Sequence, residues 1–181
     1  GGAWSGNGKL EVLSQLMRLR QICCDPRLHY EDYKAGSAKL DTCMELVHGA
    51  LDGGHRILLF SQFTGMLDII GKRLAKEDIA FLKLTGASSK ESRAKMVAQF
   101  QAGEVPVFLI SLKAGGVGLN LTAADVVIHY DPWWNVAAQD QATDRAHRIG
   151  QQHTVTVYKL IAKDTIEERI MQMQESKRDL V

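Results

Sequence analysis

Short apolar runs, separated by polar and glycine-containing segments, recur through the later and larger part of the chain. The first run, RILLFSQF at 56–63, has no alternation of apolar and polar positions, which is typical of a strand buried on both faces of a sheet. Four more runs predict further strands. They are AFLKL at 80–84, VPVFLIS at 105–111, VVIHYD at 126–131 and VTVYKLIA at 155–162.

Stretches with apolar residues at helical spacing separate or flank these runs. Residues 9–24 predict a first helix, which ends at Asp25-Pro26 and is followed by a polar connector at 27–36. Ser37 is a suitable N-cap for a second helix, which runs through Leu51 and is stopped by Asp52-Gly53-Gly54. The remaining predicted helices cover 65–77, 89–101, 135–147 and 165–179.

Strands that alternate with helices predict an α/β fold. The crossovers are expected to be right-handed, which gives a mainly parallel sheet with helices on both faces. In such a sheet, ligands bind beyond the carboxyl ends of the strands. The loops that follow the predicted strands are therefore the places to look for chemistry.

The composition is that of an ordinary globular domain, with 181 residues of which 45% are hydrophobic and 24% are charged. No apolar run reaches the roughly 18 residues that a membrane span needs, and no signal peptide is evident at the start. The formal net charge is +1, so any binding of nucleic acid depends on a local basic patch. The three cysteines, Cys23, Cys24 and Cys43, do not have the spacing of a zinc site and are expected to be reduced thiols.

The loop after the run at 105–111 is rich in glycine, with Gly115, Gly116 and Gly118 close together. Such a loop turns tightly and presents backbone N–H groups, which suit phosphate oxygens. Lys113 adds a positive charge and Asn120 adds an amide. A purely structural turn is the alternative interpretation.

Two common nucleotide-binding motifs do not fit this chain. A dinucleotide fingerprint that starts at Gly116 and Gly118 requires a third glycine at position 121, which is Leu121. A Walker A loop at Gly71-Lys72 requires a glycine at Met66 and a hydroxyl residue at Arg73. The pair Gly8-Lys9 fails the same requirements. Nothing in the sequence is therefore suited to wrap a β-phosphate and hold Mg²⁺.

The loop after the run at 126–131 reads DPWWN, and a predicted helix follows it. Adjacent Trp133 and Trp134 do not both face inward easily on one element, so one of them is expected to be partly exposed and able to lie against a sugar or base, and core packing of both is the alternative. In the helix, Gln141, Arg145 and Arg148 share one face. Two arginines on one face suit an anion such as a γ-phosphate, and a solvated helix end is the alternative.

Four stretches occur together in order and carry a specific resemblance. They are ILLFSQFTGMLDII, LTGASSKESR, LISLKAGGVGLNLTAADVVIHYDPWWN and QDQATDRAHRIGQ. With them the chain resembles the second RecA-like lobe of the Swi/Snf-type, helicase-related ATPases of superfamily two, over residues 9–181. The resemblance implies a three-layer αβα lobe with a mainly parallel sheet.

The resemblance also implies a division of the chain. Residues 1–8 are expected to be a flexible leader or a cloning remnant, and 9–36 a helix and connector that bridge from a first lobe. The helicase lobe is expected at 37–164. Residues 165–181 resemble the helix that braces the two lobes.

The family's roles carry over to matching positions as expectations. The fourth motif, near the DNA backbone, is matched by Ser61, Gln62 and Phe63, and a phosphate-contacting turn by Thr85 and Gly86. The fifth motif, which touches the tracked DNA strand and couples it to ATP, is matched by Lys113, Ala114, Gly115, Gly116 and Asn120. Trp133 and Trp134 match the segment in which an aromatic side chain reaches the duplex. The sixth motif is matched by Gln141, Arg145 and Arg148, and the two arginines are expected to be arginine fingers. The residues expected to contact the nucleotide are Gly116, Gly118, Arg145 and Arg148.

Two positions depart from the family pattern DPWWNPAxEDQA, which here has Val136 and Gln139. Val136 lies in the first helical turn, where proline merely pre-sets the backbone, so little change is expected. Gln139 removes a charge beside the site. The larger departure is that no Walker A loop or Asp-Glu-x-His box is present, so the chain is expected to be a fragment that cannot hydrolyse ATP alone.

The expected function is that of a motor lobe in a DNA-dependent ATPase that translocates on duplex DNA and remodels DNA-bound proteins. ATP and Mg²⁺ are expected to be held mainly by the first lobe, and DNA through its phosphates without sequence preference. The expected compartment is the cytoplasm or nucleoid of a prokaryote, or the nucleus of a eukaryote. The alternatives are a strand-separating helicase lobe, a non-catalytic DNA-binding or scaffolding module, and a Rossmann-type oxidoreductase.

Overall fold

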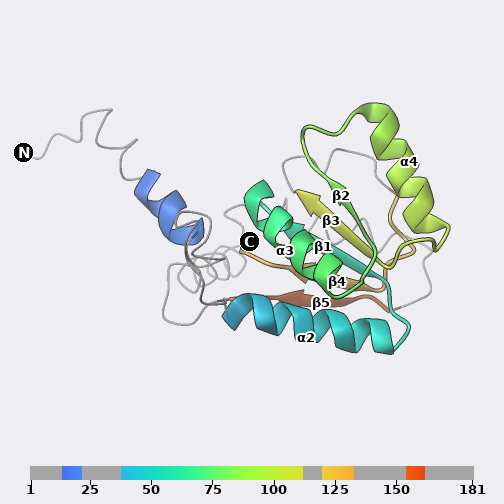
Figure 1. Ribbon diagram of the computed structural model, residues 1–181, viewed down its shortest axis with the longest axis horizontal. Helices are drawn as coiled ribbons and strands as arrows, with labels where there is room; N and C mark the ends of the chain where they lie inside the picture. Colours follow the sequence, from blue (N-terminus) through green and yellow to red (C-terminus); the bar gives the residue numbers. More distant parts are fainter. Residues whose placement is uncertain (1–13, 22–37, 112–119, 133–153, 162–181) are drawn as a thin grey trace, which may run out of the picture.

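A computed structural model describes residues 14–21, 38–111, 120–132 and 154–161. These residues contain a five-stranded sheet in the order β2-β3-β1-β4-β5, in which every paired neighbour is parallel. The strands are β1 (Ile57–Ser61), β2 (Phe81–Leu84), β3 (Val107–Ser111), β4 (Val126–His129) and β5 (Thr156–Lys159). Figure 1 shows β1 in the interior of the sheet.

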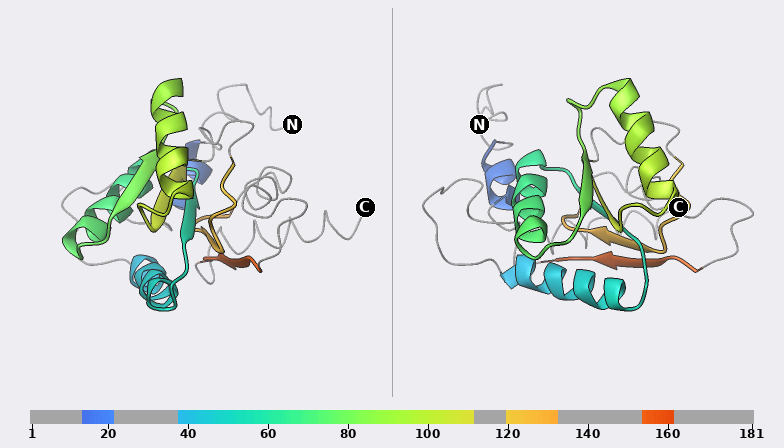
Figure 2. Two further views of the ribbon diagram at one scale, coloured as in Figure 1. Left: turned by 90° about the vertical axis from the view of Figure 1, so that its right-hand side faces the viewer. Right: turned by 45° about the vertical axis from the view of Figure 1, so that its right-hand side comes forward.

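Among the described residues, three helices cover the sheet: α2 (Ala38–Asp52), α3 (Thr64–Lys76) and α4 (Lys90–Gln101). Ile57 and Leu59 of β1 share one apolar cluster with the buried residues of α2 and α3. Leu58 and Phe60 point to the other face, where they pack with Phe100 of α4. Figure 2 shows α2 and α3 close together and α4 apart from both, so the lobe has three layers.

The three helices end in the same way. In each, a residue with positive φ follows the helix, and two backbone N–H groups donate back to carbonyls in its last turn, which is the Schellman arrangement. The residues with positive φ are Gly54 (φ 76°), Asp78 (φ 57°) and Gly103 (φ 83°). The closing bonds run from Gly54 to Leu51, His55 to Ala50, Asp78 to Ala75, Ile79 to Leu74, Gly103 to Phe100 and Glu104 to Gln99.

The structure confirms the predicted α/β class, the five strands and the helices over 38–52, 64–76 and 90–101. All residues of β1, β3 and β4 are buried, whereas β2 and β5 lie at the edges and are partly exposed. Residues 14–21 are helical, within the first predicted helix. The predicted helices at 135–147 and 165–179 and the Ser37 cap lie outside the described residues.

Within the described ranges, no helix is long and apolar enough to cross a membrane.

Candidate functional site

The carboxyl edge of the sheet brings together several residues that the sequence singled out. Phe60 pairs with Ile110 and His129, and Leu84 pairs with Ile110, so the ends of β1, β2, β3 and β4 lie at one level. Ser61 therefore lies beside Ser111, and the Thr85 turn leaves from the same edge. This is the edge at which parallel α/β sheets bind ligands.

A buried carboxylate connects the ends of β1 and β4. The Ser61 hydroxyl donates to Asp131 Oδ2, and the Gln62 backbone N–H donates to Asp131 Oδ1 over 3.2 Å. The Phe63 N–H donates to the Ser61 oxygen over 3.1 Å. These bonds turn the chain out of β1 and into α3, whose N-cap is Phe63.

Asp131 is almost completely buried, with 2% of its surface exposed. Burial raises the pKa of its carboxyl group, and the Ser61 hydrogen bond, the Lys39 charge, the Gln62 N–H and the Arg20 charge act in the opposite direction. The charged form is thus costly to hold and is stabilised by donors and cations from separate parts of the chain. Asp131 thus links the ends of β1 and β4 through hydrogen bonds.

The predicted DNA-contacting triplet Ser61, Gln62 and Phe63 is mostly turned inward. Ser61 and Phe63 are buried, and only Gln62 is half-exposed. The Gln62 side chain donates to the carbonyl oxygen of Pro132 over 3.2 Å. A role near DNA stays a prediction for this triplet, and the geometry gives Ser61 and Phe63 the additional task of holding the turn.

The turn at Thr85 and Gly86 is more open. The Thr85 N–H donates to the Ser88 hydroxyl over 3.1 Å, and the Ala87 N–H donates to the Thr85 hydroxyl over 3.3 Å. Gly86 is exposed, and a Cβ there would meet nothing within 4 Å. The turn is therefore held by two hydrogen bonds of its own and is accessible at Gly86.

The first turns of α4 follow this turn in the sequence and carry three basic residues and one exposed acidic residue, Glu91. Ser89 caps the helix by accepting from the Ser92 N–H over 3.1 Å. Lys90 and Lys95 are exposed, and Arg93 donates through Nε to the Ser88 carbonyl oxygen over 3.3 Å. Cations beside an exposed turn favour an anionic partner.

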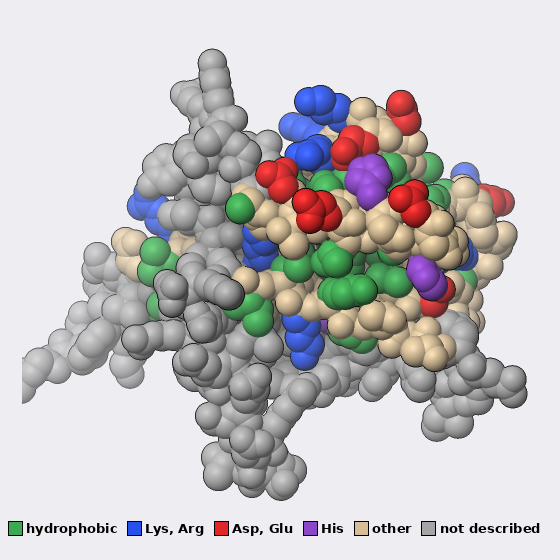
Figure 3. All heavy atoms as spheres, turned by 90° about the horizontal axis from the view of Figure 1, so that it is seen from below, with side chains coloured by type: hydrophobic (Ala, Val, Ile, Leu, Met, Phe, Trp, Pro, Cys, Tyr) green, Lys and Arg blue, Asp and Glu red, His purple; other side chains and the backbone are tan. Residues whose placement is uncertain are grey.

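The outer face of α2 has the opposite charge. Asp41, Glu45 and Asp52 are all exposed on this helix. Figure 3 shows acidic side chains gathered on the face seen from below, which α2 covers. These carboxylates are unfavourable for a polyanion, although Asp41 is paired with Arg73 of α3 over 3.4 Å.

Asn120 is exposed at the start of the segment that leads into β4. The turn just after it is fixed by Gln101, at the end of α4. Gln101 donates to the Thr122 hydroxyl over 3.0 Å and accepts from the Ala123 N–H over 2.8 Å. The backbone just after Asn120 is therefore held in place by Gln101. The contact of Asn120 with DNA stays a prediction.

Other predicted site residues lie outside the described ranges. They are Lys113, Ala114, Gly115, Gly116, Gly118, Trp133, Trp134, Gln141, Arg145 and Arg148. Their roles stay predictions. Among the described residues, no group of three or more His, Cys, Asp or Glu side chains is arranged to hold a metal ion.

Two residues of the site were not assigned a role from the sequence. Asp131 ends a buried apolar run immediately before a proline, and this position is the available signal. Arg20 lies in the helical stretch LMRLR, where it is 2% exposed and donates to Pro132. Asp131 bonds to Ser61, 70 residues away, and Arg20 bonds to Pro132, 112 residues away. Contacts over such separations are visible only in the folded structure.

Residues 38–150 match the family described as the helicase conserved C-terminal domain. Because the match is to a helicase domain, the alternative of a Rossmann-type oxidoreductase is excluded.

The chain is similar to named proteins from several organisms. It is 44% identical over 171 residues to an uncharacterized ATP-dependent helicase of Mycoplasma pneumoniae, covering 94% of this chain and 16% of that protein. It is 46% identical over 180 residues to the putative ATP-dependent helicase/translocase YwqA of Bacillus subtilis, covering 95% of this chain and 19% of that protein. It is 48% identical over 145 residues to the chromatin-remodeling ATPase INO80 of Cryptococcus neoformans, covering 80% of this chain and 8% of that protein. The chain thus spans less than a fifth of the length of these curated relatives.

Solved structures agree with this relationship. The SWI2/SNF2 ATPase core of Sulfolobus solfataricus in complex with dsDNA is 39% identical with a TM-score of 0.83, and the match covers 97% of this chain and 38% of that one. The C-terminal domain of a SWI2/SNF2 ATPase from the same organism is 36% identical with a TM-score of 0.80, covering 96% and 72%. The chain therefore belongs to the helicase C-terminal domain family and is the second RecA-like lobe of a Swi2/Snf2-type ATPase.

Proposed function

We propose that this lobe is part of a DNA-dependent ATPase that translocates on duplex DNA and remodels proteins bound to it. The observation that carries the proposal is the 39% identity, over 97% of the chain, to an ATPase core solved in complex with dsDNA. The accessible turn at Gly86 and the exposed Lys90 and Lys95 of α4 support it, because exposed ammonium groups suit the phosphates of DNA.

The proposed catalytic site is split between two lobes. Arg145 and Arg148 reach the γ-phosphate of ATP, with Gln141 on the same helical face. The first lobe of the same protein holds most of the ATP and the Mg²⁺. An arginine finger stabilises the charge that develops during phosphoryl transfer and is worth about 10³–10⁵ in rate.

The proposed DNA contacts are made to the backbone. The segment from Lys113 to Asn120 follows β3 and contains the glycines whose N–H groups suit phosphate oxygens. Opening and closing of the two lobes moves this segment along one strand of the duplex. Contacts of this kind carry no sequence information and weaken with salt.

The test is Arg148→Ala in the longer protein that contains both lobes. DNA-stimulated ATP hydrolysis is expected to fall by about 10³-fold or more, whereas binding of duplex DNA is unchanged. Arg73→Ala is the matched control, since Arg73 is a surface arginine on α3 whose partners are Asp41 and Glu77. Hydrolysis that stays within a few-fold of the parent in Arg148→Ala contradicts the finger assignment.

A strand-separating helicase is the second candidate, and the helicase names of the bacterial relatives favour it. A strand-displacement assay on the longer protein separates the two functions, because a translocase on duplex DNA hydrolyses ATP without releasing single strands.

A non-catalytic DNA-binding or scaffolding module is a third candidate, against which the pair Arg145 and Arg148 argues. The compartment follows the source, which is the cytoplasm or nucleoid in a prokaryote and the nucleus in a eukaryote.

A further inference from the structure

Arg20 is a buried cation on a helical segment that is otherwise largely exposed. Its side chain is 2% exposed, whereas Met17 and Leu19 on the same segment are 39% and 50% exposed. Burying a guanidinium while leaving neighbouring apolar side chains in solvent reverses the usual preference. The contacts of Arg20 therefore have to offset the loss of its hydration.

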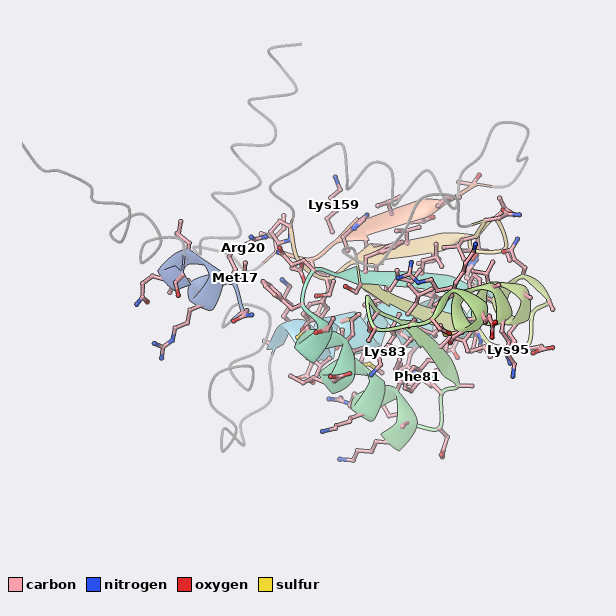
Figure 4. The ribbon with its side chains drawn as sticks, turned by 90° about the horizontal axis from the view of Figure 1, so that it is seen from above. Met17, Arg20, Phe81, Lys83, Lys95 and Lys159 are labelled. Carbon is pink, nitrogen blue, oxygen red and sulfur yellow. The ribbon has the colours of Figure 1, made fainter. Side chains whose placement is uncertain are left out.

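These contacts join three parts of the chain. Arg20 Nη2 donates a hydrogen bond of 2.8 Å to the carbonyl oxygen of Pro132, beyond the end of β4. The guanidinium carbon lies 5.9 Å from the centroid of the Phe63 ring, at the start of α3. Its charge also acts on the buried Asp131 carboxylate. Figure 4 shows Arg20 where the short helix meets the sheet.

The Pro132 carbonyl is held by two donors. Gln62 Nε2 donates to the same oxygen over 3.2 Å, from the turn between β1 and α3. Proline also restricts its own φ, which limits the freedom of the chain at this point. Trp133 and Trp134 follow directly in the sequence. The direction in which the chain leaves β4 is thus fixed from outside that strand.

We propose that Arg20 is a positioning residue that fixes the Pro132 carbonyl, the last described point before the sequence that carries the two tryptophans and the proposed arginine fingers. This inference rests on the proposed function. Through Arg20, the segment expected to bridge from the first lobe is joined directly to the segment expected to meet DNA and ATP. A shift of the bridging segment is therefore transmitted to the Pro132 carbonyl by one side chain.

Tryptophan emission tests the positioning role without nucleotide or DNA. The three tryptophans of the sequence are Trp4, Trp133 and Trp134, so Trp4→Phe leaves only the pair after Pro132. In the 181-residue chain with that change, Arg20→Met is expected to shift the emission to longer wavelength. It is also expected to raise the acrylamide quenching constant about twofold, because loss of the anchor opens the segment locally.

Three further variants make this test specific. Gln62→Ala is expected to change the emission in the same direction, and the double variant to change it less than additively, because both donors hold one oxygen. Lys72→Met removes an exposed cation from α3 and is expected to leave emission and quenching unchanged. Arg20→Lys keeps the charge without the planar fork and should lie between parent and Arg20→Met.

Unchanged emission and quenching in an Arg20→Met chain that keeps its far-ultraviolet circular dichroism overturns the proposal. If that variant does not fold, Arg20→Lys and Gln62→Ala are judged by the same criterion. In the two-lobe protein, Arg20→Met is expected to lower the kcat of DNA-stimulated ATP hydrolysis by about tenfold to a hundredfold, with the KM for ATP unchanged. An unchanged kcat also overturns the proposal. A failure of the Arg148→Ala test would overturn the motor assignment and leave the emission result standing, so the two failures are distinguishable.

Discussion

At the residue scale, His129 is a neutral side chain buried inside the sheet. It is 1% exposed, and its ring stacks on Phe60 with centroids 5.5 Å apart and an angle of 20° between the planes. Burial first, and then the charge of Lys159, lowers the pKa of His129 from 6.5 to about 4. The imidazole is therefore uncharged in the folded lobe at neutral pH.

This lowered pKa predicts an acid sensitivity of the fold. Between pH 6.5 and about 4 the unfolded chain binds a proton at this position and the folded chain does not. The free energy of unfolding should then fall as the pH drops, with a slope of at most about 1.4 kcal/mol per pH unit from this residue. His129→Phe is expected to remove this part of the pH dependence in urea denaturation at pH 7 and pH 5.

The matched control is Ile128→Val, which changes a buried residue of the same strand without a titratable group and should keep the parental pH dependence. Asp131 contributes with the opposite sign, because its pKa is raised and its share of the stability is lost as the pH rises. Comparing variants at the same pH cancels that contribution. An identical pH dependence in His129→Phe and the parent would contradict the prediction.

At the scale of the elements, Asp78 stands out among the three helix ends. Gly54 and Gly103 adopt positive φ without a Cβ, whereas Asp78 has the same kind of geometry with one (φ 57°). Asp78 is exposed, and no other role is evident for its side chain among the described contacts. We expect Asp78→Gly to raise the free energy of unfolding by about 1 kcal/mol, because it relieves the left-handed conformation.

Gly54→Asp and Gly103→Asp are the reciprocal variants and should lower the free energy of unfolding. Chemical denaturation monitored by circular dichroism measures all three changes. A destabilised Asp78→Gly, with the two reciprocal variants unaffected, would show that the left-handed conformation is not what limits stability at these ends.

The elements also show which part of the fold the sequence could predict. Runs such as ILLFS and VFLIS identify strands because burial on both faces removes the polar positions. The end of the first strand was placed too late, at residue 63, because Ser61 and the Gln62 N–H turn toward Asp131 and end the strand at 61. Local pattern does not reveal an acceptor on another strand, and for the same reason it did not reveal the buried contacts of Arg20.

At the scale of the whole molecule, the proposed function divides the catalytic site between this lobe and a first lobe. The 181-residue chain alone is expected to show no ATP hydrolysis, because no Walker A loop is present in it. Its affinity for duplex DNA should be weak and should fall as salt rises, with a slope near 0.9 per phosphate contact. A coupled ATPase assay and fluorescence anisotropy at two salt concentrations measure both quantities.

Lys113→Ala should reduce the slope of log affinity against log salt concentration by about 0.9, the value for one phosphate contact. Lys76→Ala, at the end of α3, is the control and should leave this slope unchanged. Robust turnover by the chain alone would contradict the division of the catalytic site between two lobes.

The amino edge of the sheet has a consequence for synthesis of the chain. Arg56, at the entrance to the central strand, donates to the carbonyl of Val105 and to the carboxylate of Asp125, which lie 49 and 69 residues later. A ribosome adds about 5–20 residues per second, so β1 waits several seconds for its neighbours β3 and β4. During that interval ILLFS, whose five residues are all buried in the folded lobe, is an unpaired apolar strand. Until β3 and β4 are synthesised, the nascent lobe therefore exposes an extended hydrophobic segment of the kind that chaperones bind.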